Sequence, residues 1–366
     1  MLSNKTIAVV VPCYNEETQI GEVIESMPDF VDRIIIVNDC SKDSTSNVVR
    51  SYIDNEPIST ISIGNVLDNV KPNRYNRANI VVQDLQKGEI KHYVASKVYN
   101  TNESENRIIL IDHIENGGVG ASIARGYKWA KDHGIDCTAV MAGDGQMDPD
   151  ELLDIVSPVV DEGVDYVKGN RLIHRSALLV IPKVRYFGNS ILSILTKLAS
   201  GYWRVSDTQT GYTAISNKAL NAIRIHEIYR SYGMPNDMLV KLNIAFCTLR
   251  EVEIKPIYDV GEQSKMKIMK VIPRVSLLLF KSFFIRLWKK YLFRDFHPLF
   301  ILYHLSFLLL FASIPFGYKI LYLTISPIRE ISDATILAFM FLMISSFNAF
   351  LFAMWMDIQD NERLYK

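Results

Sequence analysis

The sequence predicts an α/β protein: a mostly parallel sheet covered by helices on both faces, followed by amphipathic helices and a hairpin of two membrane-spanning helices. Two observations predict this class. Through residues 6–170, short apolar runs alternate with helical patterns, which is typical of parallel sheets whose crossover helices cover both faces. Residues 298–318 and 334–356 contain no Asp, Glu, Lys or Arg, and each stretch can cross a hydrocarbon core of ~30 Å.

The expected elements of the sheet domain follow one another along the first 170 residues. Strands are expected at Thr6–Val11, Arg33–Val37, Arg107–Ile111, Thr138–Met141 and Asp165–Lys168. Helices are expected at Glu17–Met27, Ser44–Tyr52, Gly120–Lys131 and Pro149–Asp161. The last helix has a clear start signal, since Asp148 can cap it and Pro149 suits its first position. Ligands of such sheets bind beyond the carboxyl ends of the strands, so chemistry is expected in the loops there.

Residues 56–106 interrupt this alternation. They contain three β-like runs, Thr60–Val66, Asn79–Val82 and His92–Val98, separated by Asn, Pro and Lys. We interpret the segment as an inserted β-rich subdomain or hairpin. A disordered insert is the alternative, because long segments of this kind inside a domain are often disordered.

Charge and cysteine content exclude some classes of protein. The 366 residues include 40 Lys and Arg and 40 Asp and Glu, and this neutral balance argues against a nucleic-acid-binding protein. The balance is uneven, because nine basic residues lie between 265 and 294. A basic block beside apolar sequence indicates a membrane surface.

The four cysteines are far apart, which indicates reduced thiols and neither a metal site nor a disulfide framework.

The C-terminal third is expected to anchor the protein in a membrane. We divide the chain into a first domain over 1–262, amphipathic interface helices over 263–296, and a part over 297–366 with two spans, at about 298–322 and 334–356, and a short tail. A second amphipathic stretch covers 184–203. Two buried helices of a soluble core are the alternative for the spans. No signal peptide is recognised at the N-terminus, and the positive-inside rule places residues 1–297 and the C-terminus in the cytoplasm.

Three polar or glycine-rich turns follow the first three expected strands. The first contains Pro12, Tyr14, Asn15 and Glu16, the second contains Asp39, and the third contains Asn116 and Gly118. Polar side chains at such strand ends can bind a base and a ribose, and the amides at the start of the following helix favour anions. Each turn alone is a modest signal, because Asp and Ser also cap helices that bind nothing.

The turn after the fourth expected strand is a candidate metal site. Asp144 lies there between two glycines, and Gln146 follows two residues later. Mg²⁺ and Mn²⁺ take oxygen ligands, and Mg²⁺ is commonly held by one or two carboxylates together with substrate phosphates. We therefore expect Asp144 and Gln146 to hold one of these ions, while Asp148 caps the next helix.

Together the four turns resemble those of the family 2 glycosyltransferases, which have the Rossmann-like GT-A fold. The segments VPCYNEE and NDCSKDST resemble that family's nucleotide-binding turns, and MAGDGQMDP resembles its D-x-D metal motif. Ala142 replaces the first Asp of that motif, which leaves Asp144 as the main expected ligand. The resemblance implies a nucleotide-sugar donor bound by Pro12, Tyr14, Asn15, Glu16, Asp39, Asn116, Gly118, Asp144 and Lys265.

The later segments narrow the resemblance. KGNR at 168–171, IPKVRYFGN at 181–189, SDTQTGY at 206–212 and GEQSK at 261–265 are similar to segments of dolichyl-phosphate mannose synthase and its bacterial glucosyl relatives. This likeness implies a polyprenyl phosphate as the acceptor. The acceptor phosphate would be bound by Arg171, Arg185 and Asn189, and the expected catalytic residues are Asp144, Arg171 and Arg185.

The chemistry of such an acceptor fits these residues. A phosphate monoester is largely anionic at pH 7 and needs no general base, but it needs cations to approach an anionic diphosphate, and Arg binds phosphate in a bidentate manner. Inverting transfer is expected. A UDP-sugar, of glucose or N-acetylglucosamine, is favoured over GDP-mannose, and a homo-oligomer is possible.

Two alternatives remain at this stage. A glycosyltransferase that acts on a lipid-linked saccharide or a polysaccharide would need a base for a sugar hydroxyl, and Asp237 is the candidate. A nucleotide-sensing membrane protein with a degenerate site is the other, and Ala142 is the observation in its favour.

Overall fold

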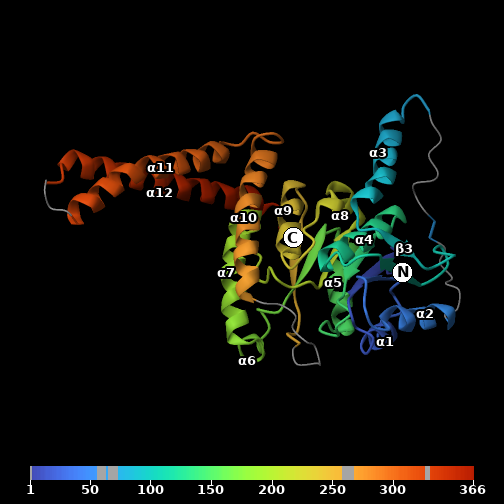
Figure 1. Ribbon diagram of the computed structural model, residues 1–366. Helices are drawn as coiled ribbons and strands as arrows, with labels where there is room; N and C mark the ends of the chain where they lie inside the picture. The colour runs from blue at the N-terminus through green and yellow to red at the C-terminus, as the bar shows by residue number, and fades with distance from the viewer. Residues whose placement is uncertain (1, 56–62, 65–72, 258–267, 326–329) are drawn as a thin grey trace.

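An eight-stranded sheet forms the centre of the computed structural model, which describes residues 2–55, 63–64, 73–257, 268–325 and 330–366 (Figure 1). The strands are β1 (Ile7–Cys13), β2 (Arg33–Asn38), β3 (Ser96–Val98), β4 (Ile108–His113), β5 (Cys137–Val140), β6 (Tyr166–Asn170), β7 (Thr213–Ser216) and β8 (Leu249–Glu253). Their order is β3-β4-β2-β1-β5-β7-β6-β8, and only β3 and β7 run antiparallel to their neighbours. The other six strands therefore end at one edge of the sheet, as expected for a mostly parallel sheet.

Helices cover both faces of this sheet and continue beyond it. They are α1 (Ile20–Glu25), α2 (Thr45–Asn55), α3 (Arg77–Gly88), α4 (Val119–Asp132), α5 (Leu152–Glu162), α6 (Ala177–Val180), α7 (Lys183–Ser200), α8 (Asn217–Ala222), α9 (Met234–Ile244), α10 (Ile268–Tyr291), α11 (Pro298–Ile325) and α12 (Asp333–Glu362). In the described part of the chain, 3₁₀ turns lie at Glu89–His92, Pro149–Glu151 and Ile225–Glu227.

Strand β1 shows why the sheet needs helices on both faces. Ala8 and Val10 belong to a core that they share with α4, α8 and α9, whereas Ile7, Val9 and Val11 belong to a second core shared with α1, α2 and α5. All five side chains are fully buried. Because successive side chains of a strand point to opposite faces, an unbroken apolar run is stable only when both faces are covered.

The five strands and four helices expected in the first 170 residues are all present, with bounds that differ by a few residues. The start of α5 is formed as its sequence predicts. The Asp148 carboxylate accepts a hydrogen bond from the amide of Asp150 at 3.0 Å, and Pro149 follows the cap. A 3₁₀ turn over Pro149–Glu151 precedes the α-helix itself.

The expected β-rich character of 56–106 is wrong for one of its runs. Asn79–Val82 lies inside α3, whose side chains are not buried. The β-branched residues there cost only a few tenths of a kcal/mol each in a helix, and the Ala, Leu, Gln and Lys around them favour one. Within His92–Val98 the strand β3 forms against β4, whereas Thr60–Val66 lies outside the described residues except for 63–64.

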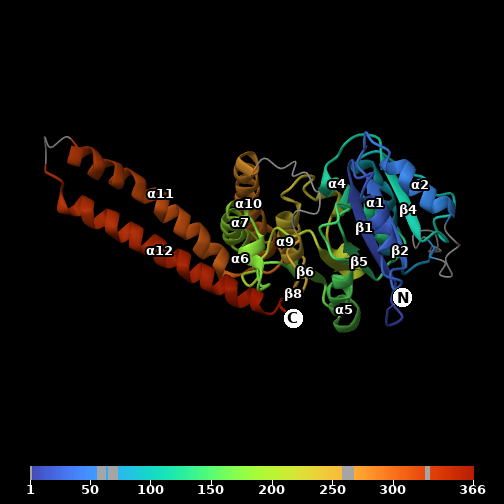
Figure 2. The ribbon, with the colours of Figure 1, turned by 90° about the horizontal axis from the view of Figure 1, so that it is seen from below.

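The two amphipathic stretches form the helices α7 and α10, which pack side by side across the direction of the C-terminal hairpin (Figures 1 and 2). Their outer surfaces are apolar, with exposed side chains at Ile191, Ile194, Leu277 and Phe280. An exposed apolar face with basic residues beside it is the pattern of helices that lie in a membrane interface.

Helices α11 and α12 form the hairpin, with 28 and 30 residues, and both are long and apolar enough to cross a membrane. They pack on each other and project away from the sheet domain (Figure 2). Most of their large apolar side chains are exposed, whereas helices of a soluble core are buried. This exposure disfavours the soluble-core alternative.

A buried polar cluster joins the base of the hairpin to the sheet domain. Arg286 of α10 forms a bidentate ion pair with Asp357 of α12, at 2.8 and 2.7 Å, and neither side chain is exposed. Arg286 also donates to the carbonyls of Leu198 and Ala199 at the end of α7. The orientation of the hairpin relative to α7 and α10 is therefore fixed by directional bonds as well as by apolar packing.

Candidate active site

The turns after β1 and β2 are bound to each other at the carboxyl edge of the sheet. Asn15 donates its amide to Ser41 Oγ at 2.9 Å and accepts from the amide of Lys42 at 2.8 Å. The amide of Glu16 donates to Thr45 Oγ1 at 3.0 Å. Asn15 has φ +56°, a left-handed conformation that Asn adopts more readily than most residues. Tyr14, Asn15 and Glu16 thus lie in a double turn held by hydrogen bonds, whereas Pro12, expected in the same turn, is the last residue but one of β1.

Asp39 at the end of β2 organises the glycine-rich turn after β4. Its carboxylate accepts from the amides of Gly117 and Gly118, both at 2.8 Å, and contacts His113 Nδ1 at 2.8 Å. Asn116 donates to its carbonyl at 3.1 Å. Burial alone would raise the pKa of Asp39, but the hydrogen bonds from His113 and the two amides outweigh it and lower that pKa. Asp39 therefore remains an anion that fixes the expected ligand-binding turn.

His113 is a residue of this site that the sequence analysis missed. Its side chain is fully buried, and its Nε2 has no hydrogen-bond partner within the described ranges. The only sequence signal was a His at the end of an apolar strand, and most such residues are ordinary core residues. The contact with Asp39 joins residues 74 positions apart, which no local pattern indicates.

Glycines in and just after the turn that follows β4 allow the backbone of a neighbouring segment to approach closely. Gly118 has φ +84°, and a Cβ placed there would lie 2.5 Å from the carbonyl oxygen of Arg230. A Cβ at Gly120 would lie 2.1 Å from that of Tyr229. These glycines are therefore required by the neighbouring segment, whatever ligand the turn binds.

The turn after β5 carries the candidate metal ligands. Asp144 accepts a hydrogen bond from the amide of Gln146 at 3.1 Å, so both residues lie on one tight turn. Gly143 packs against β1, where a Cβ would lie 3.2 Å from that of Cys13. No three His, Cys, Asp or Glu side chains converge on a common point among the described residues. One carboxylate and one amide fit an ion that substrate phosphates complete, and they do not form a complete protein site.

Arg171, directly after β6, is held by Asp207. Nε and Nη2 of Arg171 donate to the Asp207 carboxylate at 2.8 and 3.1 Å. Asp207 is buried, whereas 22% of the Arg171 side chain is exposed. Burial would raise the pKa of Asp207, but the charge and hydrogen bonds of Arg171 lower it. Asp207 also accepts from the amides of Gln209 and Thr210, so it both orients the arginine and closes a turn.

Behind this pair lie the buried Lys168 and the half-buried Glu251. Burial lowers the pKa of Lys168 to about 8, opposed by the charges of Asp207 and Glu251. Glu251 accepts from the amides of Ser206 and Asp207 and from Asn170 Nδ2. The loop that carries Asp207, and therefore the position of Arg171, is fixed by residues of both β6 and β8.

The residues expected to help bind the acceptor phosphate beside Arg171 lie on α7. Asn189 lies in α7 and is half-buried. Arg185 is in the first two turns of α7, but its side chain lies outside the described residues, as does all of Lys265. Helix α7 is tied to the Asp207 loop, because Ser193 Oγ donates to the carbonyl of Ser206 at 2.8 Å. The backbone that carries Arg185 and Asn189 thus belongs to a helix anchored beside Arg171.

Asp237, the candidate base for transfer to a sugar hydroxyl, makes structural contacts within its own segment. It lies in the first turn of α9, where it accepts from the amide of Tyr229 at 2.8 Å and pairs with Lys241 at 2.5 Å. Its side chain is largely buried. This arrangement fixes the segment that packs on Gly118 and Gly120.

The sequence of this chain is similar to those of known dolichyl-phosphate glycosyltransferases. A UDP-N-acetylglucosamine–dolichyl-phosphate N-acetylglucosaminyltransferase of Methanococcus voltae is 29% identical over 263 residues, which span 70% of this chain and 88% of that protein. A dolichyl-phosphate beta-glucosyltransferase of Dictyostelium discoideum is 33% identical over 73 residues, 17% of this chain and 22% of that protein.

Solved structures show a more distant likeness. The glucosyl-3-phosphoglycerate synthase from Mycobacterium tuberculosis, solved with UDP and also with Mn²⁺ and UDP, is 16% identical and has a TM-score of 0.45 over 78% of this chain and 80% of that one. The model of Glycosyl transferase family 2 matches residues 8–65 and 62–224, which include β1 to β7 and the turns that carry Asp39, Asp144 and Arg171. The chain belongs to glycosyl transferase family 2.

Proposed function

We propose that this protein transfers a sugar, with inversion, from a UDP-sugar to a polyprenyl phosphate at the cytoplasmic face of a membrane. The donor and acceptor follow those named for the Methanococcus voltae relative. One observation carries the proposal furthest. Arg171, which Asp207 orients and whose guanidinium suits a phosphate, is followed directly by a segment that exposes Ile173, Leu178, Leu179 and Val180.

That juxtaposition suits an acceptor with a phosphate head and an apolar tail. Leu179 is 87% exposed, and α7, with Ile191 and Ile194 exposed, follows immediately. Burial of such side chains in the membrane interface is favourable by roughly 25 cal/mol per Å². The phosphate of a lipid lying in the membrane would then reach Arg171 without leaving the interface.

The reaction on such an acceptor needs positioning and cations more than proton transfer. The phosphate oxygen attacks the anomeric carbon, the bond to the nucleotide diphosphate breaks, and its electrons leave with the diphosphate. Arg171, together with Arg185, would offset the repulsion between the two anions. Asp237 is already held by Tyr229 and Lys241, so the alternative reaction on a sugar hydroxyl gains no support.

A divalent ion fits the donor side of the site. Asp144 and Gln146 would hold Mg²⁺ or Mn²⁺, which offsets negative charge on the leaving diphosphate. The double turn of Asn15 and Glu16 and the turn fixed by Asp39 would bind the nucleotide beside them. Asp39 in this view is a positioning residue, because its carboxylate already accepts from Gly117 and Gly118.

The test is a transfer assay with the full chain in detergent. We would supply a polyprenyl phosphate, Mg²⁺ or Mn²⁺ and labelled UDP- and GDP-sugars, and measure label extracted into organic solvent. We expect label from one donor, lost on chelation and in Asp144→Ala. Protein that binds nucleotide but labels no lipid phosphate would overturn the acceptor, and label from GDP-mannose alone would overturn the donor.

A further inference from the structure

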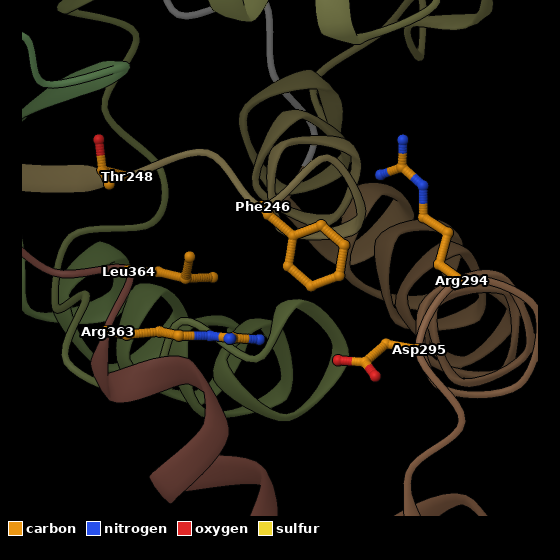
Figure 3. Close-up of a pocket in the computed structure, with 6 residues that line it drawn as sticks. All are labelled: Phe246, Thr248, Arg294, Asp295, Arg363 and Leu364. Carbon is orange, nitrogen blue, oxygen red and sulfur yellow. The ribbon is translucent and has the colours of Figure 1, made fainter.

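A cavity of about 550 Å³ lies at the base of the hairpin, and the site described above does not use it. Its lining residues are Phe246, Thr248, Arg294, Asp295, Arg363 and Leu364 (Figure 3). Arg294 lies between α10 and α11, and Arg363 directly follows α12. The cavity is therefore placed where one span begins and the other ends.

The cavity is remote from the active site. Thr248 immediately precedes β8, whereas Arg171 immediately follows β6, and these two strands are parallel neighbours. Five residues of strand at ~3.3 Å each separate the two edges by roughly 17 Å. A ligand of the cavity would thus lie at the amino edge of the sheet and not among the expected ligands of donor and acceptor.

Phe246 lies close to three basic side chains, of which Arg294 and Arg363 line the cavity and Lys290 is buried behind it. Its ring lies 5.0 Å from Lys290 Nζ and 5.6 Å from the guanidinium carbons of both Arg294 and Arg363. In Figure 3 the ring stands between the two arginines, which lie just beyond the ends of α10 and α12. A cation within ~6 Å of an aromatic face is attracted to it, so the ring stabilises a concentration of positive charge.

The backbone of Phe246 is also unusual. It has φ +58° and occupies the left-handed position after α9, where the amide of Cys247 reaches back to the carbonyl of Leu242. Glycine is the usual residue there, because a side chain costs about 1–2 kcal/mol in this conformation. A phenylalanine at this position points to a use for its ring.

The surroundings are those of a membrane–water boundary. Phe293 and Phe296 flank the cavity residues in sequence and are strongly exposed, and Trp288 is partly exposed. Aromatic side chains of this kind gather at the level of lipid headgroups, and basic pockets beside spans bind anionic headgroups. Asp295 and Asp360 offset part of the charge, since Asp360 pairs with Arg363 at 3.0 Å and with Lys290 at 3.3 Å.

We propose that this cavity binds the phosphate of an anionic membrane phospholipid, with Arg294 and Arg363 as its ligands and Phe246 as the ring that organises them. The proposal rests on the hairpin crossing a membrane and is independent of which sugar or acceptor the enzyme uses. Two arginines from different helices would be bridged by one headgroup, so the bound lipid would join the ends of α10 and α12.

The test measures lipid retention by native mass spectrometry of the full chain in detergent. We would compare phosphatidylglycerol with phosphatidylcholine and add inorganic phosphate as a competitor. We expect preferential retention of phosphatidylglycerol. A basic residue near an anionic lipid surface contributes about fivefold in affinity, so Arg294→Gln with Arg363→Gln should weaken retention about 30-fold. Phe246→Leu should weaken it about threefold.

A matched control separates a site from general attraction. Arg274→Gln with Lys289→Gln removes two exposed charges of α10 outside the cavity and should leave retention unchanged. Asp295→Asn should strengthen retention, a gain that no unfolded variant can imitate. Equal losses in both double variants, no preference for phosphatidylglycerol, or displacement by millimolar inorganic phosphate would each overturn the proposal.

Discussion

Two arginine–aspartate pairs in this protein have nearly the same geometry and different surroundings. Arg171 binds Asp207 at 2.8 and 3.1 Å, and Arg286 binds Asp357 at 2.8 and 2.7 Å. Arg286 is completely buried, whereas Arg171 is 22% exposed. Bond lengths alone therefore do not distinguish a charge positioned for a ligand from a charge that joins helices.

What differs is the rest of each arginine's environment. Arg286 also donates to the carbonyls of Leu198 and Ala199 and contacts Tyr291, so protein groups surround it. Asp207 holds Arg171 through Nε and Nη2, while 22% of the Arg171 side chain is exposed. Partial exposure of a fixed arginine side chain is therefore the feature that fits substrate binding.

Arg286→Ala should destabilise the protein by about 3–5 kcal/mol, because it leaves Asp357 charged, buried and without its partner. Thermal unfolding of the full chain in detergent should move down by roughly 10 °C. The double variant Arg286→Met with Asp357→Leu should recover part of this loss, since it removes both charges but leaves the carbonyls of Leu198 and Ala199 without their donor. An unfolding temperature of Arg286→Ala equal to that of the wild type would contradict the role assigned to the pair.

Arg171→Ala should reduce sugar transfer roughly 100- to 1,000-fold, because a fixed donor to the reacting phosphate is lost. Its cost in stability should be smaller than that of Arg286→Ala, since Asp207 keeps the amides of Gln209 and Thr210. Arg171→Lys should also be impaired, because a lysine cannot reproduce the bidentate contact with Asp207.

The measurement is kcat/KM for transfer beside nucleotide binding, which should not change. Arg224→Ala is the control, since Arg224 is an exposed arginine paired with Glu227, and its loss should leave transfer intact. Full activity of Arg171→Ala would remove the functional distinction between the two pairs.

Gly201→Ala should cost more than a substitution at a comparable glycine. Gly201 has φ +77°, and an added Cβ would lie 2.6 Å from Arg286 Nη1. Gly163 has φ +65° with open space around it, so Gly163→Ala costs only the left-handed conformation, about 1–2 kcal/mol. The difference in unfolding free energy between the two variants isolates the contact with Arg286. Equal costs would mean that Arg286 moves aside freely.

Local patterns predicted the parts of this molecule that depend on neighbours in sequence. The apolar run of β1 and the cap at Asp148 were readable because burial on both faces and a helix start each have a short-range signal. In contrast, Asp207 is 36 positions from Arg171, and Asp357 is 71 from Arg286. Only the folded chain brings such partners together.

The candidate active site also combines features that local sequence patterns predict with contacts that only the folded chain makes. The turns at Asn15, Asp39 and Asp144 were recognised as polar strand ends, but the internal bonds of Asp39 to His113 and Gly118 depend on strand order. The prediction of a β-like run at Asn79–Val82 was wrong for a related reason. Its β-branched side chains suit a strand only when a partner strand exists, and α3 has none, so the local preference of the surrounding residues decides.

The ion pair between Lys255 and Asp148 lies at the surface, and we expect its loss to have the smallest effect on stability. Lys255 Nζ lies 2.9 Å from Asp148, whose pKa is lowered mainly by that hydrogen bond. Asp148→Asn keeps a capping oxygen and should cost less than about 1 kcal/mol, the usual range of an exposed ion pair. Asp148→Ala also removes the cap on Asp150 and should cost about 1 kcal/mol more. Denaturant unfolding of both variants measures the difference. Equal losses of more than about 1 kcal/mol in the two variants would show that charge, and not the cap, determines the contribution of Asp148, and would weaken the conclusion that exposure limits what such pairs contribute.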